Sequence, residues 1–153
     1  KETLLYMNQK CDLTLNEGLR LHYSVNPSFK KNVEIVPAFY NHDIAHVLFG
    51  LDTSVMNESL ADMRCVFSTN WGLKQYMSDY FSDPNAKKIL INIMKEIGFF
   101  GGMWLGVKSI PKMIKVYFDS KQMKSKWKIN PNEKLLNTSL TDLRKKYNIT
   151  VIN

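Results

Sequence analysis

Apolar residues recur at spacings of three and four along most of this chain, which is the spacing of one face of an α-helix. One stripe has spacings of four, three and four: Met56, Leu60, Met63 and Phe67. Another repeats every four residues: Ile89, Ile93 and Ile97. Strand-like alternation is confined to residues 32–36 and 149–152. We therefore predict an all-α fold, a single-domain helical bundle.

Capping and breaking residues divide the helical segments. One helix is expected to end at Gly50, and the next to begin with Thr53 or Ser54 as its N-cap. Proline at position 84 suits the first turn of a further helix, which Gly98 should end.

The positive charge is concentrated in the second half of the chain. The net charge is +7, and residues 84–153 carry 14 Lys/Arg against 4 Asp/Glu, which is 14 − 4 = +10. Lys108, Lys112 and Lys115 recur at i, i+4 and i+7 beside an apolar side. This pattern is typical of a basic amphipathic helix, with Pro111 in its first turn and Ser109 as its N-cap.

A helix of this kind suits an anionic membrane surface. The alternative is an ordinary solvated face over a core. No nucleic-acid partner is expected, because no helix-turn-helix, RNP or zinc-finger pattern accompanies the lysines. The uncharged segment 97–107 is too short to cross a bilayer, and the first residues show no signal-peptide pattern, so we expect a cytoplasmic, peripheral membrane location.

The segment with most chemical content is Asn41-His42-Asp43-Ile44-Ala45-His46, followed after eleven residues by Glu58. On a helix, His42 and His46 lie one turn apart, and Asp43 is three residues from His46. An antiparallel turn near Gly50 would bring Glu58 towards them. The spacing predicts a metal site with four ligands: His42, Asp43, His46 and Glu58.

Imidazole with carboxylate suits zinc, manganese, cobalt or ferrous iron better than calcium or magnesium, and we favour zinc. Asp62, one turn beyond Glu58, is expected to orient a histidine from behind the ligands. The competing interpretation is a pair of histidines that merely form hydrogen bonds. The isolated His22 is expected to be structural.

The spacing H-D-x-x-H-x11-E in residues 42–58 resembles the motif of the coenzyme Q (ubiquinone) biosynthesis protein Coq-four family. Three further segments are similar to that family's pattern: Leu48–Thr53, Ile110-Pro111 and Leu143–Ile149. The resemblance covers residues 39–149 and suggests a helical domain over 37–150. Residues 1–36 would be an N-terminal arm without an assigned element, and Lys121–Thr138 an expanded connection.

The resemblance implies an all-helical protein, often a homodimer or part of a biosynthetic complex, that holds an isoprenoid tail in an apolar channel. It implies oxidative decarboxylation of a polyprenylated hydroxybenzoate at a membrane surface, which in a eukaryote would be the matrix side of the mitochondrial inner membrane. Glu58 is then expected to be catalytic as well as metal-binding. We expect Met56, Met63 and Phe67 to form apolar walls for the lipid.

Two other functions fit parts of the pattern. His42-Asp43 is also the central doublet of HD-type metal-dependent phosphohydrolases, although Glu58 would then have no role. A non-catalytic scaffold that binds isoprenoid lipid and a structural metal is the second alternative. A closed shell of four protein ligands would favour the scaffold, and an open coordination position would favour catalysis.

Overall fold

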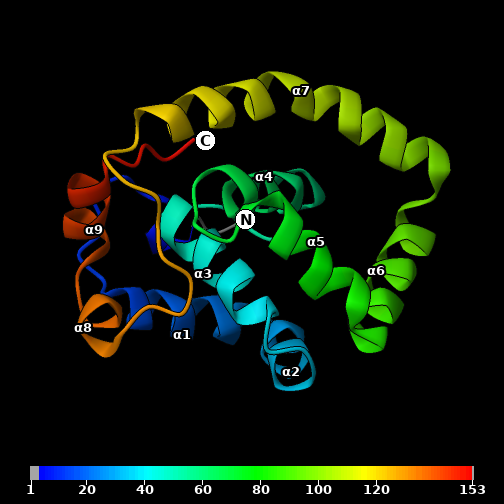
Figure 1. Cartoon of the computed structure of the whole chain (residues 1–153), viewed down its shortest axis with the longest axis horizontal. Coiled ribbons are helices and arrows are strands. Elements are labelled where there is room, and N and C mark those ends of the chain that lie inside the picture. The colour runs from blue at the N-terminus through cyan, green and yellow to red at the C-terminus, as the bar shows by residue number, and fades with distance from the viewer. Residues whose placement is uncertain (1–3, 153) are drawn as a thin grey trace.

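A computed structural model of the protein describes residues 4–152, apart from six side chains in its middle: Ile93, Glu96, Phe99, Phe100, Met103 and Leu105. The described chain contains one short 3-10 helix and nine α-helices, and no strand (Figure 1). The predicted all-α helical bundle is confirmed. The predicted burial of Ile93 lies outside the described side chains.

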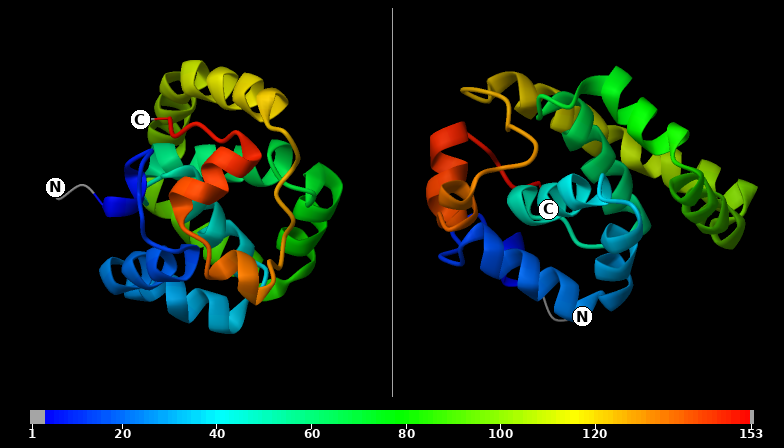
Figure 2. Two further views of the ribbon diagram at one scale, coloured as in Figure 1. Left: turned by 90° about the vertical axis from the view of Figure 1, so that its left-hand side faces the viewer. Right: turned by 60° about the horizontal axis from the view of Figure 1, so that its bottom comes forward.

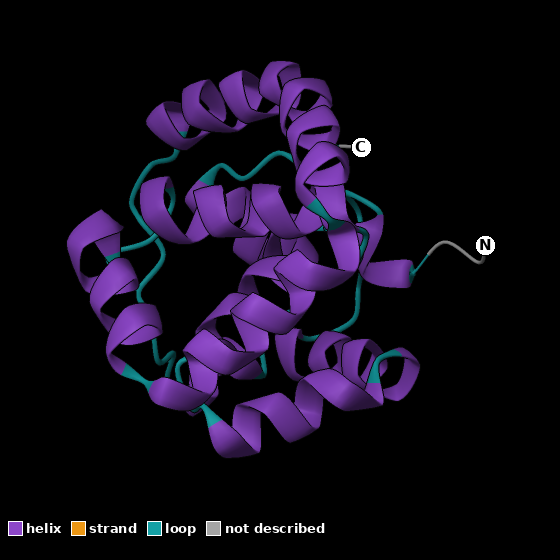
Figure 3. Ribbon diagram, turned by 90° about the vertical axis from the view of Figure 1, so that its right-hand side faces the viewer, coloured by secondary structure: helices purple, strands orange, loops and turns teal. Residues whose placement is uncertain are grey.

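In chain order the elements are η1 (Leu5–Met7), α1 (Leu15–Val25), α2 (Pro27–Ile35), α3 (Phe39–Phe49), α4 (Val55–Phe67), α5 (Gly72–Ser82), α6 (Pro84–Ile97), α7 (Phe99–Gln122), α8 (Glu133–Leu136) and α9 (Leu140–Tyr147). Figure 3 shows short loops joining most neighbouring helices. Within the part of the chain that the structure describes, every helix is too short or too polar to span a lipid bilayer.

The turn between α3 and α4 is where the sequence places it. Gly50 ends α3 with φ of 71°, a left-handed conformation that glycine adopts without a steric penalty. Ser54 occupies the N-cap position of α4, but its side chain makes no capping bond. Asp52 instead accepts hydrogen bonds from the Ser54 amide at 2.9 Å and from the Asn57 side chain at 2.7 Å. These bonds fix the direction in which α4 begins.

Helix α6 has its predicted limits, whereas α7 does not. Asp83 caps α6 by accepting bonds from two backbone amides, Pro84 is in its first turn, and Gly98 follows it. The predicted start at Pro111 with Ser109 as N-cap is wrong, because α7 begins at Phe99 and runs through the proline. Packing against α4 holds α7 helical although Pro111 has no amide to donate.

Residues 4–36 form η1, α1 and α2 and pack on the rest of the bundle. Thr14 and Glu17 form a capping box that starts α1. Gly18 lets α1 approach α3, since a Cβ there would lie 2.5 Å from a Val47 methyl. The strand-like alternation at 32–36 is not a strand, because residues 27–35 are helical, and residues 149–152 form no strand either.

Helix α4 lies between α3 and α7 and packs most extensively with these two. Figure 2 shows α6 and α7 as a pair that extends beyond the other helices. Helix α4 can therefore present one face to the predicted metal motif on α3 and another to α7.

Candidate metal centre

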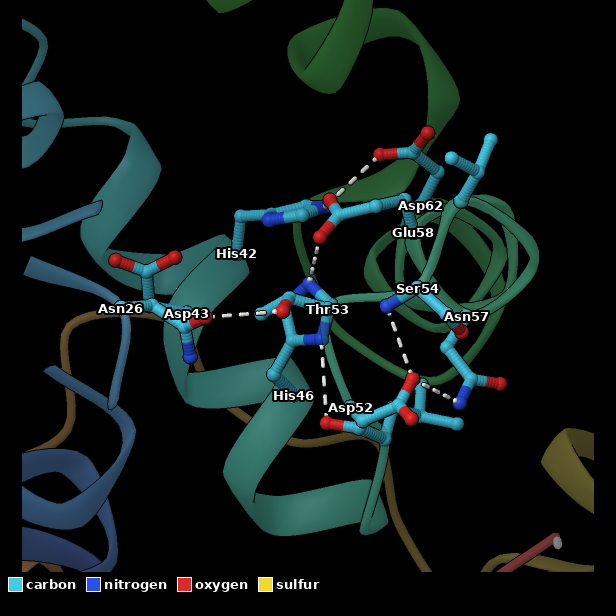
Figure 4. Close-up of polar contacts among 12 residues, drawn as sticks. Asn26, His42, Asp43, His46, Asp52, Thr53, Ser54, Asn57, Glu58 and Asp62 are labelled. Atoms are coloured by element: carbon cyan, nitrogen blue, oxygen red, sulfur yellow. Dashed lines mark hydrogen bonds and ion pairs between the residues drawn. The ribbon is translucent and has the colours of Figure 1, made fainter. Parts of the chain in front are cut away.

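Three of the four predicted ligands converge between α3 and α4 (Figure 4). The Nε2 atom of His46 lies 3.4 Å from Oε1 of Glu58, and Nε2 of His42 lies 3.9 Å from Oε2 of the same carboxylate. One ligand atom from each of these three residues lies within 4.8 Å of the others. Both histidines are buried, and the Glu58 side chain is 32% exposed. The cluster is thus closed on the α3 side and accessible beside Glu58.

The orientation of His46 is fixed by the turn that follows α3. Its Nδ1 atom lies 3.3 Å from the Leu51 carbonyl oxygen, and the Leu51 amide bonds back to the His46 carbonyl at 2.8 Å. A hydrogen bond from one ring nitrogen to a backbone carbonyl is the usual way in which a protein aims the other nitrogen at a metal. The turn at Gly50 therefore ends α3 and also fixes the position of Nε2 of His46.

The donor set fits a divalent cation. Nε2 of His46 and Oε1 of Glu58 are buried and have no hydrogen-bond partner within residues 4–152. They face each other at 3.4 Å, as an ion pair when the imidazole is protonated, and this separation also lets both atoms bind one cation. Imidazole nitrogen with a carboxylate oxygen is a donor set that zinc and its neighbours accept. A cation bound between these atoms would satisfy both of them.

Asp62 contacts His42 from a different side than the sequence suggests. Its Oδ1 atom lies 3.0 Å from Nε2 of His42, the nitrogen that also faces Glu58, and it accepts a hydrogen bond from the Tyr76 hydroxyl. Asp62 therefore lies at the rim of the cluster, with its side chain 50% exposed. No local sequence pattern pointed to Tyr76, which comes from α5.

The carboxylates strongly affect the charge of His42. Burial lowers the pKa of His42, but the hydrogen bond and charge of Asp62, with the charges of Glu58 and Asp43, outweigh it and raise the pKa to about 9. For Glu58, burial raises the pKa and the nearby His46 and His42 more than offset it, so the pKa is lowered. The surrounding carboxylates therefore stabilise positive charge in the cluster.

Asp43 does not join the other three predicted ligands. Its buried carboxylate has Oδ1 3.8 Å from Nε2 of His22, and Figure 4 shows it apart from Glu58. His22 also meets the Tyr6 hydroxyl through Nδ1 at 3.1 Å and stacks on His46 with ring centroids 5.4 Å apart. The isolated histidine of the sequence therefore forms a polar layer behind His46.

The predicted lipid-contacting residues lie elsewhere on α4. Met63 lines a hollow of about 290 Å³ between α4 and α7, and Phe67 packs against Tyr117 with centroids 5.3 Å apart. Met56 is half-buried. Met63 follows Glu58 by five residues, about 140° around a helix of 3.6 residues per turn. The hollow and the metal cluster thus lie on different faces of α4.

The predicted membrane-facing lysines lie on α7. Lys108 and Lys115 are exposed, and Lys112 is half-buried. They lie on one side of α7. Helix α4 separates α7 from the metal motif on α3.

Comparisons with protein-family models, curated proteins and solved structures find no match to this chain.

Proposed function

We propose that this protein binds one divalent metal ion, preferably zinc, through His42, His46 and Glu58, and acts with it on the acidic head of a prenylated lipid. The observation that carries the proposal is the convergence of one ligand atom each from His42, His46 and Glu58, all within 4.8 Å of one another. Three protein ligands leave a fourth position for substrate, which is the arrangement of catalytic rather than structural zinc.

The metal would supply Lewis acidity towards a carboxylate or phenolate oxygen of the substrate. The residues around it have separate tasks. Glu58 is the ligand nearest solvent, so it borders the side from which a head group would enter. Asp62 contacts Nε2 of His42, the nitrogen that would bind the metal, so its carboxylate lies beside the metal position. Tyr76, whose pKa is raised by burial and by the charge of Asp62, keeps its proton and donates a hydrogen bond to that carboxylate.

The substrate class comes from the family resemblance. We propose oxidative decarboxylation of a polyprenylated hydroxybenzoate, in which the bond between ring carbon and carboxyl carbon breaks and carbon dioxide leaves. Water supplies the hydroxyl that replaces the carboxyl, and two electrons and two protons pass to an external acceptor such as molecular oxygen. Such a substrate resides in a bilayer, so a peripheral membrane location is part of the proposal.

The phosphohydrolase alternative is not proposed. That chemistry needs His42 and Asp43 to hold the same metal, whereas the ligand atoms that lie close together come from His42, His46 and Glu58 and not from Asp43.

The test is incubation of the metal-loaded protein with a polyprenylated hydroxybenzoate and an oxidant, followed by mass spectrometry for loss of the carboxyl group. We expect turnover by the native chain and none by Glu58→Gln, with Glu34→Gln on α2 as the matched control. Metal binding together with bound lipid but no turnover would identify a scaffold. Absence of both metal and lipid would overturn the proposal.

A further inference from the structure

Helix α7 has an unusual distribution of polar and apolar side chains. Its buried residues include two serines, Ser109 and Ser120, besides Val116. Its large apolar residues at spacings of three, three, four and four point outward: Trp104, Val107, Ile110, Ile114 and Phe118. We call these five the outer stripe, and each is between 49% and 62% exposed. Large apolar side chains that are exposed in a row on one side of a helix mark an interaction site.

The charges beside the outer stripe are all positive among the described side chains of α7 that face solvent. Lys108 places its ammonium 4.9 Å from the centre of the Trp104 ring, and Lys115 is exposed one turn before Phe118. The only acidic residue of α7, Asp119, is turned inward and pairs with Arg64 of α4 at 2.6 Å. Helix α6 adds three exposed lysines: Lys87, Lys88 and Lys95.

We propose that the outer stripe of α7 inserts into the interface of an anionic lipid bilayer, with the flanking lysines on the head groups. An amphipathic helix that lies in the membrane plane combines an apolar stripe with lysines and an aromatic anchor in this way. A second copy of the chain is a poorer partner, because packing stripe on stripe would bring lysines of both copies together. Anionic head groups neutralise the same lysines.

The hollow between α4 and α7 extends this apolar surface. Ile110, Ile114 and Phe118 of the outer stripe form part of its wall, and Met63 of α4 forms another part. Docking through the stripe would therefore bring the hollow to the depth of the lipid chains. The inference deepens the peripheral membrane location of the proposed function by naming the surface that binds, but it rests on surface side chains and requires no metal.

Trp104 is a built-in reporter for the test. It is 62% exposed, whereas the other two tryptophans, Trp71 and Trp127, are 4% and 2% exposed. With vesicles of phosphatidylcholine and phosphatidylglycerol we expect co-sedimentation and a blue shift of Trp104 emission. Both should weaken as salt rises and be much smaller with phosphatidylcholine alone.

Ile114→Glu should reduce partitioning roughly tenfold or more, because a charge replaces an inserted apolar side chain. Ile35→Glu on α2 is the matched control, because Ile35 is 54% exposed and Ile114 is 53% exposed. It should leave partitioning unchanged. Joint replacement of Lys108, Lys112 and Lys115 by Glu should weaken binding to anionic vesicles by a similar factor or more. Circular dichroism and metal content of each variant separate lost docking from lost folding and from a failed metal site.

The inference is overturned if the native chain does not bind anionic vesicles, or if Ile114→Glu binds them as well as the native chain does. It is also overturned if light scattering without lipid finds a dimer that Ile114→Glu dissociates while vesicle binding is absent. That last result would assign the outer stripe to a second copy.

Discussion

Nε2 of His46 faces Oε1 of Glu58 across 3.4 Å, and neither atom has a hydrogen-bond partner in residues 4–152. Two helices that are separated by a five-residue turn thus bring a nitrogen and an oxygen ligand together in a buried place. The prediction of metal binding rests on this pair of atoms and on His42 beside them.

We expect about one divalent metal ion per chain in the native protein, and nearly none in His46→Ala or Glu58→Gln, because each variant loses one of three ligands. Elemental analysis after dialysis measures the ratio. Asp43→Asn should keep its metal, since Asp43 faces His22. Equal metal content in all four proteins would refute the site.

The metal-free protein should become less stable as the pH rises from 6.5 to about 9. The pKa of His42 is raised from an ordinary 6.5 to about 9 in the folded state, so its contribution is complete below pH 6.5 and lost as the pH rises through 9. The loss should be on the order of 1–3 kcal/mol, after allowance for the exposure of Asp62. Urea unfolding of chelator-treated protein at several pH values measures it.

Asp62→Asn is the control for this pH dependence, because it removes the largest cause that raises the pKa of His42. The variant should show a flatter stability profile above pH 6.5. A slope as steep as that of the native chain would assign the pH dependence to other groups.

Gly50→Ala should destabilise the protein by about 2 kcal/mol or more, because alanine is strained at this φ and its Cβ would lie 2.7 Å from a Val151 methyl. Gly72→Ala isolates the first cause. Gly72 has φ of 69° with no atom within 4 Å of an added Cβ, so we expect a loss of only about 1 kcal/mol. Chemical unfolding of both variants gives the comparison, and equal losses would contradict the predicted clash.

Arg144→Met should cost roughly 3 kcal/mol or more, because several buried carbonyls, those of Leu48 and Tyr6 among them, lose the hydrogen bonds that Arg144 donates. The guanidinium donates to Leu48 O at 2.9 Å, Val47 O at 3.0 Å and Tyr6 O at 2.6 Å. Lys145→Met, on the exposed neighbour, serves as the control in thermal unfolding. Arg144→Lys should recover little of the loss, since an ammonium cannot span the same oxygens.

Local signals in the sequence predicted much of the fold. Capping and breaking residues such as Gly50, Pro84 and Gly98 act on their immediate neighbours, so their effects are visible in a single sequence. The capping box of Thr14 and Glu17 is a signal of the same kind, and it marks α1 in a region for which we had predicted no element. The helix start predicted at Pro111 is wrong because the packing of α7 on α4 outweighs the preference of proline for the first turn of a helix.

The candidate site, like the fold, has a part that local sequence signals predict and a part that they do not. The spacing of His42, His46 and Glu58 is local to a helix pair, and the structure brings these residues together. The direction of Asp43 depends on α1, which supplies His22 from twenty-one residues earlier, so helical spacing alone could not predict it. Tyr76 reaches Asp62 from a third helix, and no sequence pattern announces that contact.

The buried guanidinium of Arg144 also bears on the order in which the molecule is completed. It joins the carbonyls at the end of α3 to the carbonyl of Tyr6, a residue that precedes Arg144 by 138 positions in the chain. Contacts across such separations form late in folding, because a long loop must close first. During synthesis, all three metal ligands leave the ribosome well before the side chain that secures the end of their helix. The centre should therefore reach its final rigidity, and its full affinity for metal, only once Arg144 has also left the ribosome.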